Sequence, residues 1–343
     1  MLKVSSRILT LHPRNIFRIS RMEEKEVVNV ILRIEDGSGK VGTGEASPNP
    51  FYRETASDVD RRLQSLQGFL ASRRIESVAD IASVWSEAWP ILSPSRAAQC
   101  ALDIALWDLV ARKQGMTVSE LAHGDAPGPV TSCCTIGIST PEELPAKVEE
   151  LRQNPIIKVK SDQRADLEPL RFIRSRTSAQ LIIDANCAWD GVDVKSLSPQ
   201  LKDLGVVLIE QPLPPQESAR MPDFLRDSCI PVVADESCVD EQDVSQMPGH
   251  FSGFNIKLVK CGGLTPALRM LHEGRERGLK VMVGCMLETS VLIAAGAVIG
   301  QKTDFADLDG SWLLRDDPFV GLKFEKGILT PSPEPGLGIV LPD

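Results

Sequence analysis

The chain has 343 residues, of which 42% are hydrophobic and 25% are charged, a composition typical of a folded globular protein. Its 38 Lys and Arg residues against 47 Asp and Glu residues give a net charge of −9, which argues against a nucleic-acid partner or an anionic membrane surface. None of the eight cysteines forms a CxxC pair, so neither a zinc ribbon nor a thioredoxin-like motif is indicated. The scattered cysteines show no disulfide pattern, and the cytoplasm is therefore the expected compartment.

The first 115 residues predict a mixed α+β region. The N-terminal MLKVSSRILTLHP lacks the apolar stretch that a signal peptide needs. Residues 27–34 (VVNVILRI) predict a strand, and after the turn EDGSGK a second short strand begins at VGTGEA. The stretch SRAAQCALDIALWDLVARKQG predicts a helix with a face of small residues that ends at Gly115, and HGDAPGPV at 123–130 is expected to be a linker.

A regular alternation of strands and helices follows this linker. The apolar strand-like runs are TSCCTIGI, IIKVK, LIIDANC, VVLIEQP, VVADES, GFNIKLV and KVMVGC. Helical stretches such as TPEELPAKVEELRQ and TPALRMLHEGRERG lie between them, so that a strand recurs about every 25 residues. This spacing predicts parallel βα units, and seven strands in a row favour a closed α/β barrel over an open sheet. The run VLIAAGAVIG at 291–300 is too short to span a membrane and predicts a buried helix.

Charged residues stand at the ends of five consecutive predicted strands. Alternation along IIKVK puts Lys158 and Lys160 on one face of their strand. The next strands carry three acids and a further lysine, which are Asp184, Glu210, Asp235 and Lys257. Each acid alone fits equally well as an N-cap of the following helix. Three oxygen ligands in series, without histidine or thiolate, favour a Mg²⁺ site at the barrel mouth.

A metal between lysines suits one kind of chemistry, the removal of a proton α to a carboxylate. The metal stabilises the enediolate, and a lysine beside another ammonium is expected to have a lowered pKa and to act as a base. Bases on two sides of the carbon allow racemisation or epimerisation. Lys260 competes with Lys257 for the role of base, but we expect it to lie beyond the strand end, in solvent.

The runs IIKVK, LIIDANCAW, VLIEQPLP, VVADES and FNIKLVKCGGL resemble the signature strands of the enolase superfamily, in its muconate lactonizing enzyme subgroup. The resemblance extends to GTGEA and ALDIALWDL near the N-terminus and to the closing PGLGI. Members of this superfamily pair a lysine or histidine base with Mg²⁺. The resemblance implies an α/β fold, with a (β/α)₇β barrel over residues 126–319 and an α+β capping domain over residues 1–125 that residues 320–343 complete.

The resemblance also implies roles for individual residues. One Mg²⁺ per subunit is expected on Asp184, Glu210 and Asp235, and Asn186 and Glu236 are expected in or next to the metal shell. Lys160 and Lys257 would be the acid/base pair, and Lys158 would assist at the substrate carboxylate. The family commonly forms symmetric oligomers, so a homo-oligomer is expected.

The segment FADLDGSW discriminates among members of the subgroup. Asp307 and Asp309 alternate on the expected last barrel strand, so that both carboxylates face the mouth, where they suit a substrate α-ammonium. The alternative is a solvated acidic turn before Gly310. This D-x-D resembles that of dipeptide epimerases, as does GCMLETS at 284–290, in which Cys285 and Met286 are expected to line the mouth.

The favoured reaction is therefore epimerisation of the C-terminal residue of a dipeptide by 1,1-proton transfer. The alternatives within the subgroup are o-succinylbenzoate synthesis, N-acylamino acid racemisation and cycloisomerisation, whose substrates carry no free ammonium. A non-catalytic barrel is disfavoured, because a scaffold gains nothing from concentrating charges in one mouth.

Substrate side-chain specificity is expected from FRISRMEEKE (17–26) and SPNPFYRET (47–55). Epimerases that act on Ala-Glu resemble this region but carry a basic residue where an alignment by eye places Glu24, beside Glu23. The epimerised residue is therefore expected to be apolar or cationic and not glutamate. A shift of one turn in the alignment, to Arg18 or Arg21, would reverse this expectation, and an exposed acidic loop without substrate contact fits equally well.

Overall fold

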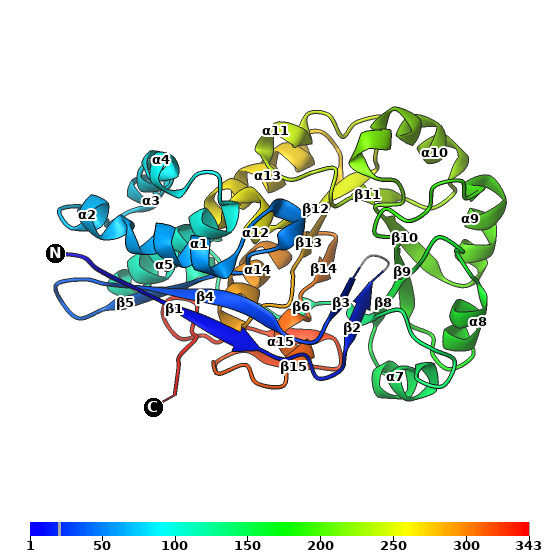
Figure 1. The fold of residues 1–343 in the computed structure, drawn as a ribbon, viewed down its shortest axis with the longest axis horizontal. Coiled ribbons are helices and arrows are strands. Elements are labelled where there is room, and N and C mark those ends of the chain that lie inside the picture. Colours follow the sequence, from blue (N-terminus) through cyan, green and yellow to red (C-terminus); the bar gives the residue numbers. More distant parts are fainter. Residues whose placement is uncertain (20–21, 343) are drawn as a thin grey trace.

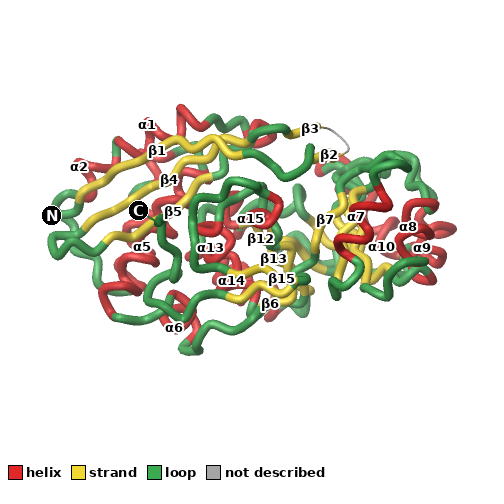
Figure 2. Tube along the Cα trace, turned by 90° about the horizontal axis from the view of Figure 1, so that it is seen from below, coloured by secondary structure: helices red, strands yellow, loops and turns green. Residues whose placement is uncertain are grey.

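The computed structural model describes residues 1–19 and 22–342. A smaller N-terminal region, blue to cyan in Figure 1, lies beside a larger barrel coloured green to orange. The red C-terminal segment returns along the underside to the N-terminal region, which Figure 2 shows from below.

The N-terminal region contains a three-stranded antiparallel sheet in the order β1-β4-β5. Its strands are β1 (Lys3–Leu11), β4 (Val27–Glu35) and β5 (Val41–Ala46), and a separate hairpin joins β2 (Phe17–Ile19) to β3 (Met22–Glu24). The strands predicted at 27–34 and at VGTGEA are confirmed as β4 and β5.

Helix α5 (Arg96–Gln114) packs on the sheet through the predicted face of small residues. A Cβ atom at Gly44 would lie 2.0 Å from the Ala101 carbonyl oxygen, so this strand can approach the helix only because it carries glycine. Gly115, with φ 68°, ends the helix as predicted. The other helices here are η1 (Pro50–Tyr52), α1 (Ala56–Gln64), α2 (Leu66–Leu70), α3 (Val78–Glu87), α4 (Trp89–Leu92) and α6 (Val118–His123).

The barrel consists of eight parallel strands in chain order. They are β7 (Cys134–Ile136), β8 (Ile156–Lys160), β9 (Gln180–Asp184), β10 (Val206–Glu210), β11 (Val232–Ala234), β12 (Gly253–Lys257), β13 (Lys280–Gly284) and β14 (Phe305–Asp307). The first and last strands meet where the Cys133 N–H donates to the Ala306 carbonyl oxygen at 2.8 Å, which brings the sheet close to closure. The predicted barrel of seven βα units and a final strand is confirmed.

Helices cover the outside of the barrel and connect its strands (Figure 1). They are α7 (Leu144–Leu151), α8 (Glu168–Arg174), α9 (Val194–Asp203), η2 (Pro215–Arg220), α10 (Met221–Asp227), α11 (Glu241–Val244), α12 (Leu258–Cys261), α13 (Leu264–Glu276) and α14 (Ser290–Gly300). The apolar run at 291–300 is buried within α14, as predicted. None of the described helices has both the length and the hydropathy required to cross a membrane.

The C-terminal segment contacts both regions. After α15 (Gly310–Leu313), the strands β15 (Lys323–Glu325) and β16 (Ile328–Thr330) form a small sheet with β6 (Val130–Thr131). Farther along, the Leu337 N–H donates to Asp108 of α5 at 2.7 Å. The division of the chain at residues 125 and 320 stays a prediction.

Candidate active site

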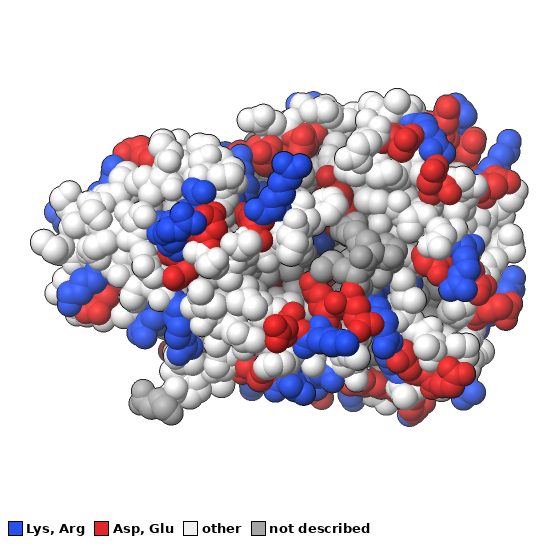
Figure 3. All heavy atoms as spheres, viewed as in Figure 1, with Lys and Arg blue, Asp and Glu red and all other residues white. Residues whose placement is uncertain are grey.

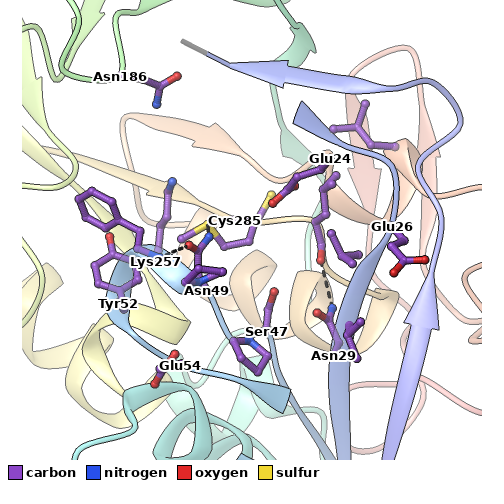
Figure 4. Close-up of a pocket in the computed structure, with 18 of the residues that line it drawn as sticks. Glu24, Glu26, Asn29, Ser47, Asn49, Tyr52, Glu54, Asn186, Lys257 and Cys285 are labelled. Carbon is purple, nitrogen blue, oxygen red and sulfur yellow. Dashed lines mark hydrogen bonds between the residues drawn. The ribbon is translucent and has the colours of Figure 1, made fainter. Parts of the chain in front are cut away.

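A pocket of about 690 Å³ lies between the C-terminal ends of the barrel strands and the N-terminal region. The barrel contributes lysines and acids to its wall, and residues 23–29 and 47–56 contribute the opposite side. Figure 4 shows Lys257, Cys285 and Asn186 on the barrel side facing Glu24 and Tyr52 from the N-terminal region. Figure 3, a space-filling view in the orientation of Figure 1, shows acidic side chains gathered near the middle of the visible face of the molecule.

Strand β8 places Lys158 and Lys160 on one face, as predicted. Lys158 is 1% exposed, and its Nζ lies 3.0 Å from Asp184, 2.7 Å from Glu210 and 2.7 Å from Asp307. Lys160, nearer the mouth, donates to Asp184 Oδ2 at 2.6 Å. The charge of two neighbouring ammonium groups is therefore offset by carboxylates from strands β9, β10 and β14.

Asp184, Glu210 and Asp235 are buried at the ends of three neighbouring strands. None of them is the N-cap of a following helix, because Asp193 caps α9, Arg220 precedes α10 and Asp240 caps α11. The alternative of a helix cap is thus wrong for all three. Burial raises the pKa of Glu210 to about 7, and the charges of Asp184 and Asp235 add to this shift, so the three carboxylates are close enough to interact.

Asp235 holds two lysines, one on each carboxylate oxygen. Lys257 Nζ donates to Oδ2 at 2.9 Å, and Lys260 Nζ donates to Oδ1 at 2.7 Å. Lys260 also donates to the main-chain carbonyls of Asp235, Cys238 and Asn255 at 2.6, 2.9 and 3.2 Å. The expectation that Lys260 is solvated is wrong: it is 2% exposed, because α12 turns its side chain back beneath the ends of β11 and β12. Lys257, and not Lys260, lines the pocket.

For Lys158 and Lys257, the expectation of a lowered lysine pKa does not hold with the charges present in the structure. Burial disfavours the ammonium of Lys158, yet Asp184, Asp307 and Glu210 raise its pKa well above the ordinary value. Burial likewise opposes the charge of Lys257, and Asp235 raises its pKa. Each ammonium lies on a carboxylate, and this attraction exceeds the repulsion between lysines.

Lys160 and Lys257 enter the pocket from opposite walls. Their strands, β8 and β12, are four positions apart in an eight-stranded barrel, and both side chains line the same cavity. A carbon atom bound between them would have a proton donor or acceptor on each face. This arrangement can move a proton from one side of the carbon to the other.

The donor chemistry of the acid cluster fits a hard divalent cation. Three buried carboxylates converge from adjacent strands with oxygen donors alone, the set that Mg²⁺ prefers. Across residues 1–19 and 22–342, no group of three or more His, Cys, Asp or Glu side chains is already spaced to hold a metal ion. In this structure, lysine ammonium groups contact all three carboxylates, Asp184, Glu210 and Asp235.

Asn186 and Glu236 lie beside this cluster. Both are buried and line the pocket. The Asn186 N–H donates to Asp184 Oδ1 at 2.9 Å, and Asn186 adopts the left-handed conformation with φ 43°. Their placement matches the expectation for residues in or next to a metal shell, while the role itself stays a prediction.

Asp307 and Asp309 are both buried and both line the pocket, so the solvated turn is excluded. Strand β14 ends at Asp307, and Asp309 lies beyond it at the start of α15, so the predicted alternation along one strand is wrong. Asp307 accepts from Lys158 on Oδ2 and from the Cys133 thiol at 3.0 Å on Oδ1. Asp309 Oδ2 accepts from the Thr135 N–H at 2.7 Å. Burial, followed by the charge of Asp307, raises the pKa of Asp309 to about 7.

Two residues that hold these acids, Cys133 and Thr135, were missed by the sequence reasoning. They belong to the first barrel strand region, which was predicted at TSCCTIGI, and barrel closure places it next to the last strand. A closed barrel could have indicated these residues in advance, because it places the first strand beside the last, and the inward side chains of neighbouring strands lie close together. Asn255, which donates to Glu210 Oε1 at 2.8 Å, was also missed.

On the N-terminal side of the pocket, Glu24 is half-buried and points into the cavity (Figure 4). Burial raises its pKa, and the opposing influence of Lys160 indicates that the two charges are near each other. The alternative of an exposed loop therefore does not describe Glu24. Glu23 instead pairs with Arg18 at 3.0 Å, and Arg18 also contacts Glu143 at 2.9 Å. Arg21 lies outside the described residues.

The predicted mouth residues Cys285 and Met286 line the pocket next to these acids. They belong to the loop between β13 and α14. Met286 Sδ accepts a long contact of 3.9 Å from Asn49 Nδ2, which joins this loop to the N-terminal side of the pocket.

A nearly closed α/β barrel that carries lysines and acids at its mouth, beneath a separate α+β region, defines a barrel of the enolase type. Residues 3–122 match the mandelate racemase/muconate lactonizing enzyme N-terminal domain, and residues 143–343 match the enolase C-terminal domain-like family. The chain therefore belongs to the enolase superfamily, in its mandelate racemase/muconate lactonizing enzyme group.

Curated relatives and solved structures similar to the chain include several dipeptide epimerases. An L-Ala-D/L-amino acid epimerase of Flavobacterium johnsoniae is 36% identical, with 99% of this chain and 100% of that protein covered. The L-Ala-D/L-Glu epimerase of Escherichia coli is 35% identical over 91% of this chain and 94% of its own. A dipeptide epimerase of Methylococcus capsulatus, whose structure is complexed with Mg and the dipeptide L-Arg-D-Lys, has a TM-score of 0.89 at 30% identity and covers 98% of this chain and 99% of its own.

Proposed function

We propose that the protein is an isomerase that epimerises a dipeptide at the α-carbon of its C-terminal residue. The observation that carries this proposal is the approach of Lys160 and Lys257 to one pocket from opposite walls, with Asp307 and Asp309 in the same pocket. The named activities of the relatives support the same reaction. Lys158 already contacts Asp307, so substrates without an amine, which the other reactions of the subgroup use, would leave the buried Asp309 without a cation.

In the proposed reaction, one lysine accepts the proton that leaves the α-carbon, and the other lysine donates a different proton to the opposite face. One lysine, as the free amine, removes the proton from its face, and the other, as the ammonium, returns a proton on the opposite face. Asp307 and Asp309 hold the α-ammonium of the first residue, which fixes the dipeptide relative to the lysines. Lys158, which is buried and contacts Asp307, would provide positive charge near the substrate carboxylate.

A divalent cation, one Mg²⁺ per subunit, is part of the proposal. Asp184, Glu210 and Asp235 would hold it, with Asn186 and Glu236 in or next to its shell. When bound, it would stabilise the negative charge that develops on the substrate carboxylate and would offset the acids that raise the pKa values of Lys158 and Lys257.

For the epimerised side chain, we favour a cationic residue over an apolar one. Glu24 points into the pocket, and Arg18, the described arginine nearest to it in sequence, is already paired with Glu23 and Glu143. A cationic side chain would place its charge opposite Glu24. A homo-oligomer in the cytoplasm remains our proposal for assembly and compartment.

The test is α-proton exchange in deuterated water with a dipeptide library and added Mg²⁺, followed by mass spectrometry and chiral chromatography. We expect deuterium at the C-terminal residue, inversion of that centre, and faster exchange for Ala-Lys or Ala-Arg than for Ala-Glu. Lys160→Ala and Lys257→Ala serve as controls for each other, because each variant keeps the base on one face of the α-carbon. Each variant should therefore exchange the α-proton when the C-terminal residue has one configuration, L or D, and should not exchange it when that residue has the other. Exchange that persists for both configurations in both variants would refute the assignment of the two bases.

A further inference from the structure

A buried carboxylate of the N-terminal sheet, Glu45 on β5, reaches across into the barrel. Its side chain is fully buried, and neither Oε1 nor Oε2 contacts a lysine or arginine among the described residues. Oε1 accepts from the Thr289 N–H at 2.9 Å, while Oε2 accepts from the Thr289 hydroxyl at 2.6 Å and from the Leu292 N–H at 3.2 Å. Thr289 is the N-cap of α14, so Glu45 provides a second cap for this barrel helix from another part of the chain.

Asn29, on the neighbouring strand β4, extends this contact to the pocket wall. Its Nδ2 donates to Glu45 Oε1 at 2.8 Å and to the Leu287 carbonyl oxygen at 3.0 Å, and Figure 4 shows it at the edge of the pocket. The Leu287 side chain packs with Leu11 and Leu314 in a small apolar cluster. The N-terminal sheet thus holds both the main chain and a side chain of the segment 285–289.

This segment lies where the proposed substrate would bind. It follows β13, the strand between β12, which carries Lys257, and β14, which carries Asp307. Cys285, Met286 and Leu287 line the pocket. Near the start of the segment, the Met286 carbonyl oxygen packs directly against Gly310. A Cβ atom at Gly310 would lie only 2.4 Å from this oxygen, so the contact is possible only with glycine. Gly310 follows Asp309 directly, so a shift of the segment would act on the position of Asp309.

We propose that Glu45 is a positioning residue through which the N-terminal sheet sets the segment 285–289 and thereby the affinity of the pocket for its dipeptide. The inference rests on the proposed function for the identity of the ligand, whereas the anchoring of the segment does not depend on it. Glu45 touches no reacting atom. Its effect should therefore appear in KM and in the dynamics of the segment.

The experiment compares Glu45→Gln with a matched control, Asp103→Asn. Asp103, on α5, is an equally buried carboxylate that caps the barrel helix α13, through the Thr265 N–H at 2.9 Å and the Thr265 hydroxyl at 2.5 Å, but it does not line the pocket. The amide at position 45 keeps the size of the side chain and places an N–H against one of the present donors. We expect both variants to unfold at a lower temperature than the wild type.

Only Glu45→Gln should change the pocket. We expect KM for the dipeptide to rise by about tenfold or more with kcat changed by less than about threefold, the range expected when hydrogen bonds to a charged group are lost. We also expect faster amide hydrogen exchange in peptides that cover residues 285–292, and Asp103→Asn should leave both properties within about twofold of the wild type.

The proposal is overturned if Glu45→Gln and Asp103→Asn have the same KM and the same exchange in residues 285–292. Should the wild type epimerise no dipeptide, the proposed function fails, and the exchange measurement still decides whether Glu45 anchors the segment. Should Glu45→Gln not fold, Asn29→Ala replaces it: loss of the contact with Leu287 should speed exchange at 285–289, and unchanged exchange there overturns the proposal.

Discussion

Asp309→Asn tests whether the acid pair binds a substrate ammonium. Both oxygens of Asp307 are engaged, by Cys133 and by Lys158, whereas Asp309 uses Oδ2 for the Thr135 N–H. Asp309 is therefore the acid better placed to receive the ammonium. Asparagine can keep the contact with Thr135 through its carbonyl oxygen, so the substitution removes the charge and preserves the fold.

The loss of a charge-assisted hydrogen bond corresponds to about 1.5–3 kcal/mol, or roughly 10- to 150-fold in KM. The assay is steady-state epimerisation of a free dipeptide and of its N-acetyl derivative, which carries no ammonium. We expect the effect of Asp309→Asn on the free dipeptide alone. An equal loss for both substrates would mean that Asp309 acts on the structure of the pocket and not on the ammonium.

The pKa of Asp309 gives the same test a pH dependence. Because its pKa in the folded protein is raised to about 7, the carboxylate becomes protonated as the pH falls through 7 and no longer attracts the ammonium. KM of the wild type for a free dipeptide should therefore rise below pH 7, by up to roughly tenfold per pH unit. In Asp309→Asn this rise should disappear, and its persistence would refute the assignment to Asp309.

Two further predictions concern Lys260 and Glu24. Lys260→Met should lower the free energy of unfolding, measured in urea, by about 3–5 kcal/mol, because it leaves buried acceptors around Asp235 without their donor. The exposed control Lys195→Met should change this free energy by less than about 0.5 kcal/mol. A loss below about 1 kcal/mol for Lys260→Met would contradict this reasoning. Glu24→Lys should shift the ratio of kcat/KM for Ala-Lys over Ala-Glu toward Ala-Glu by about tenfold or more, since a pocket-facing charge changes sign. The control is Glu334→Lys, at an exposed position outside the pocket, and an equal shift in both variants would deny Glu24 a specific role.

Much of the fold follows from local properties of the chain. The β-branched runs and their alternation with helical stretches predicted the barrel, because a strand or helix needs only neighbouring residues to adopt its geometry. The same argument placed Lys158 and Lys160 on one face and the acids at strand ends. Asp309 shows the limit of the argument, since the chain leaves the strand after Asp307 and the predicted alternation stops there.

The site depends on contacts that no local pattern specifies. The Thr135 N–H reaches Asp309 across 174 residues, and the Thr289 N–H reaches Glu45 across 244. Lys260 illustrates the same point at short range, because its burial depends on how α12 turns beneath two strand ends.

By itself, the sequence determined which residues bear charge, which segments form strands and the order in which they enter the barrel. Only the tertiary structure decided which carboxylate each ammonium meets, and so which pKa values rise or fall. The physical reason is that hydrogen bonding and desolvation act over a few ångströms in space. Barrel closure and the docking of the N-terminal sheet bring together groups that the chain itself keeps far apart.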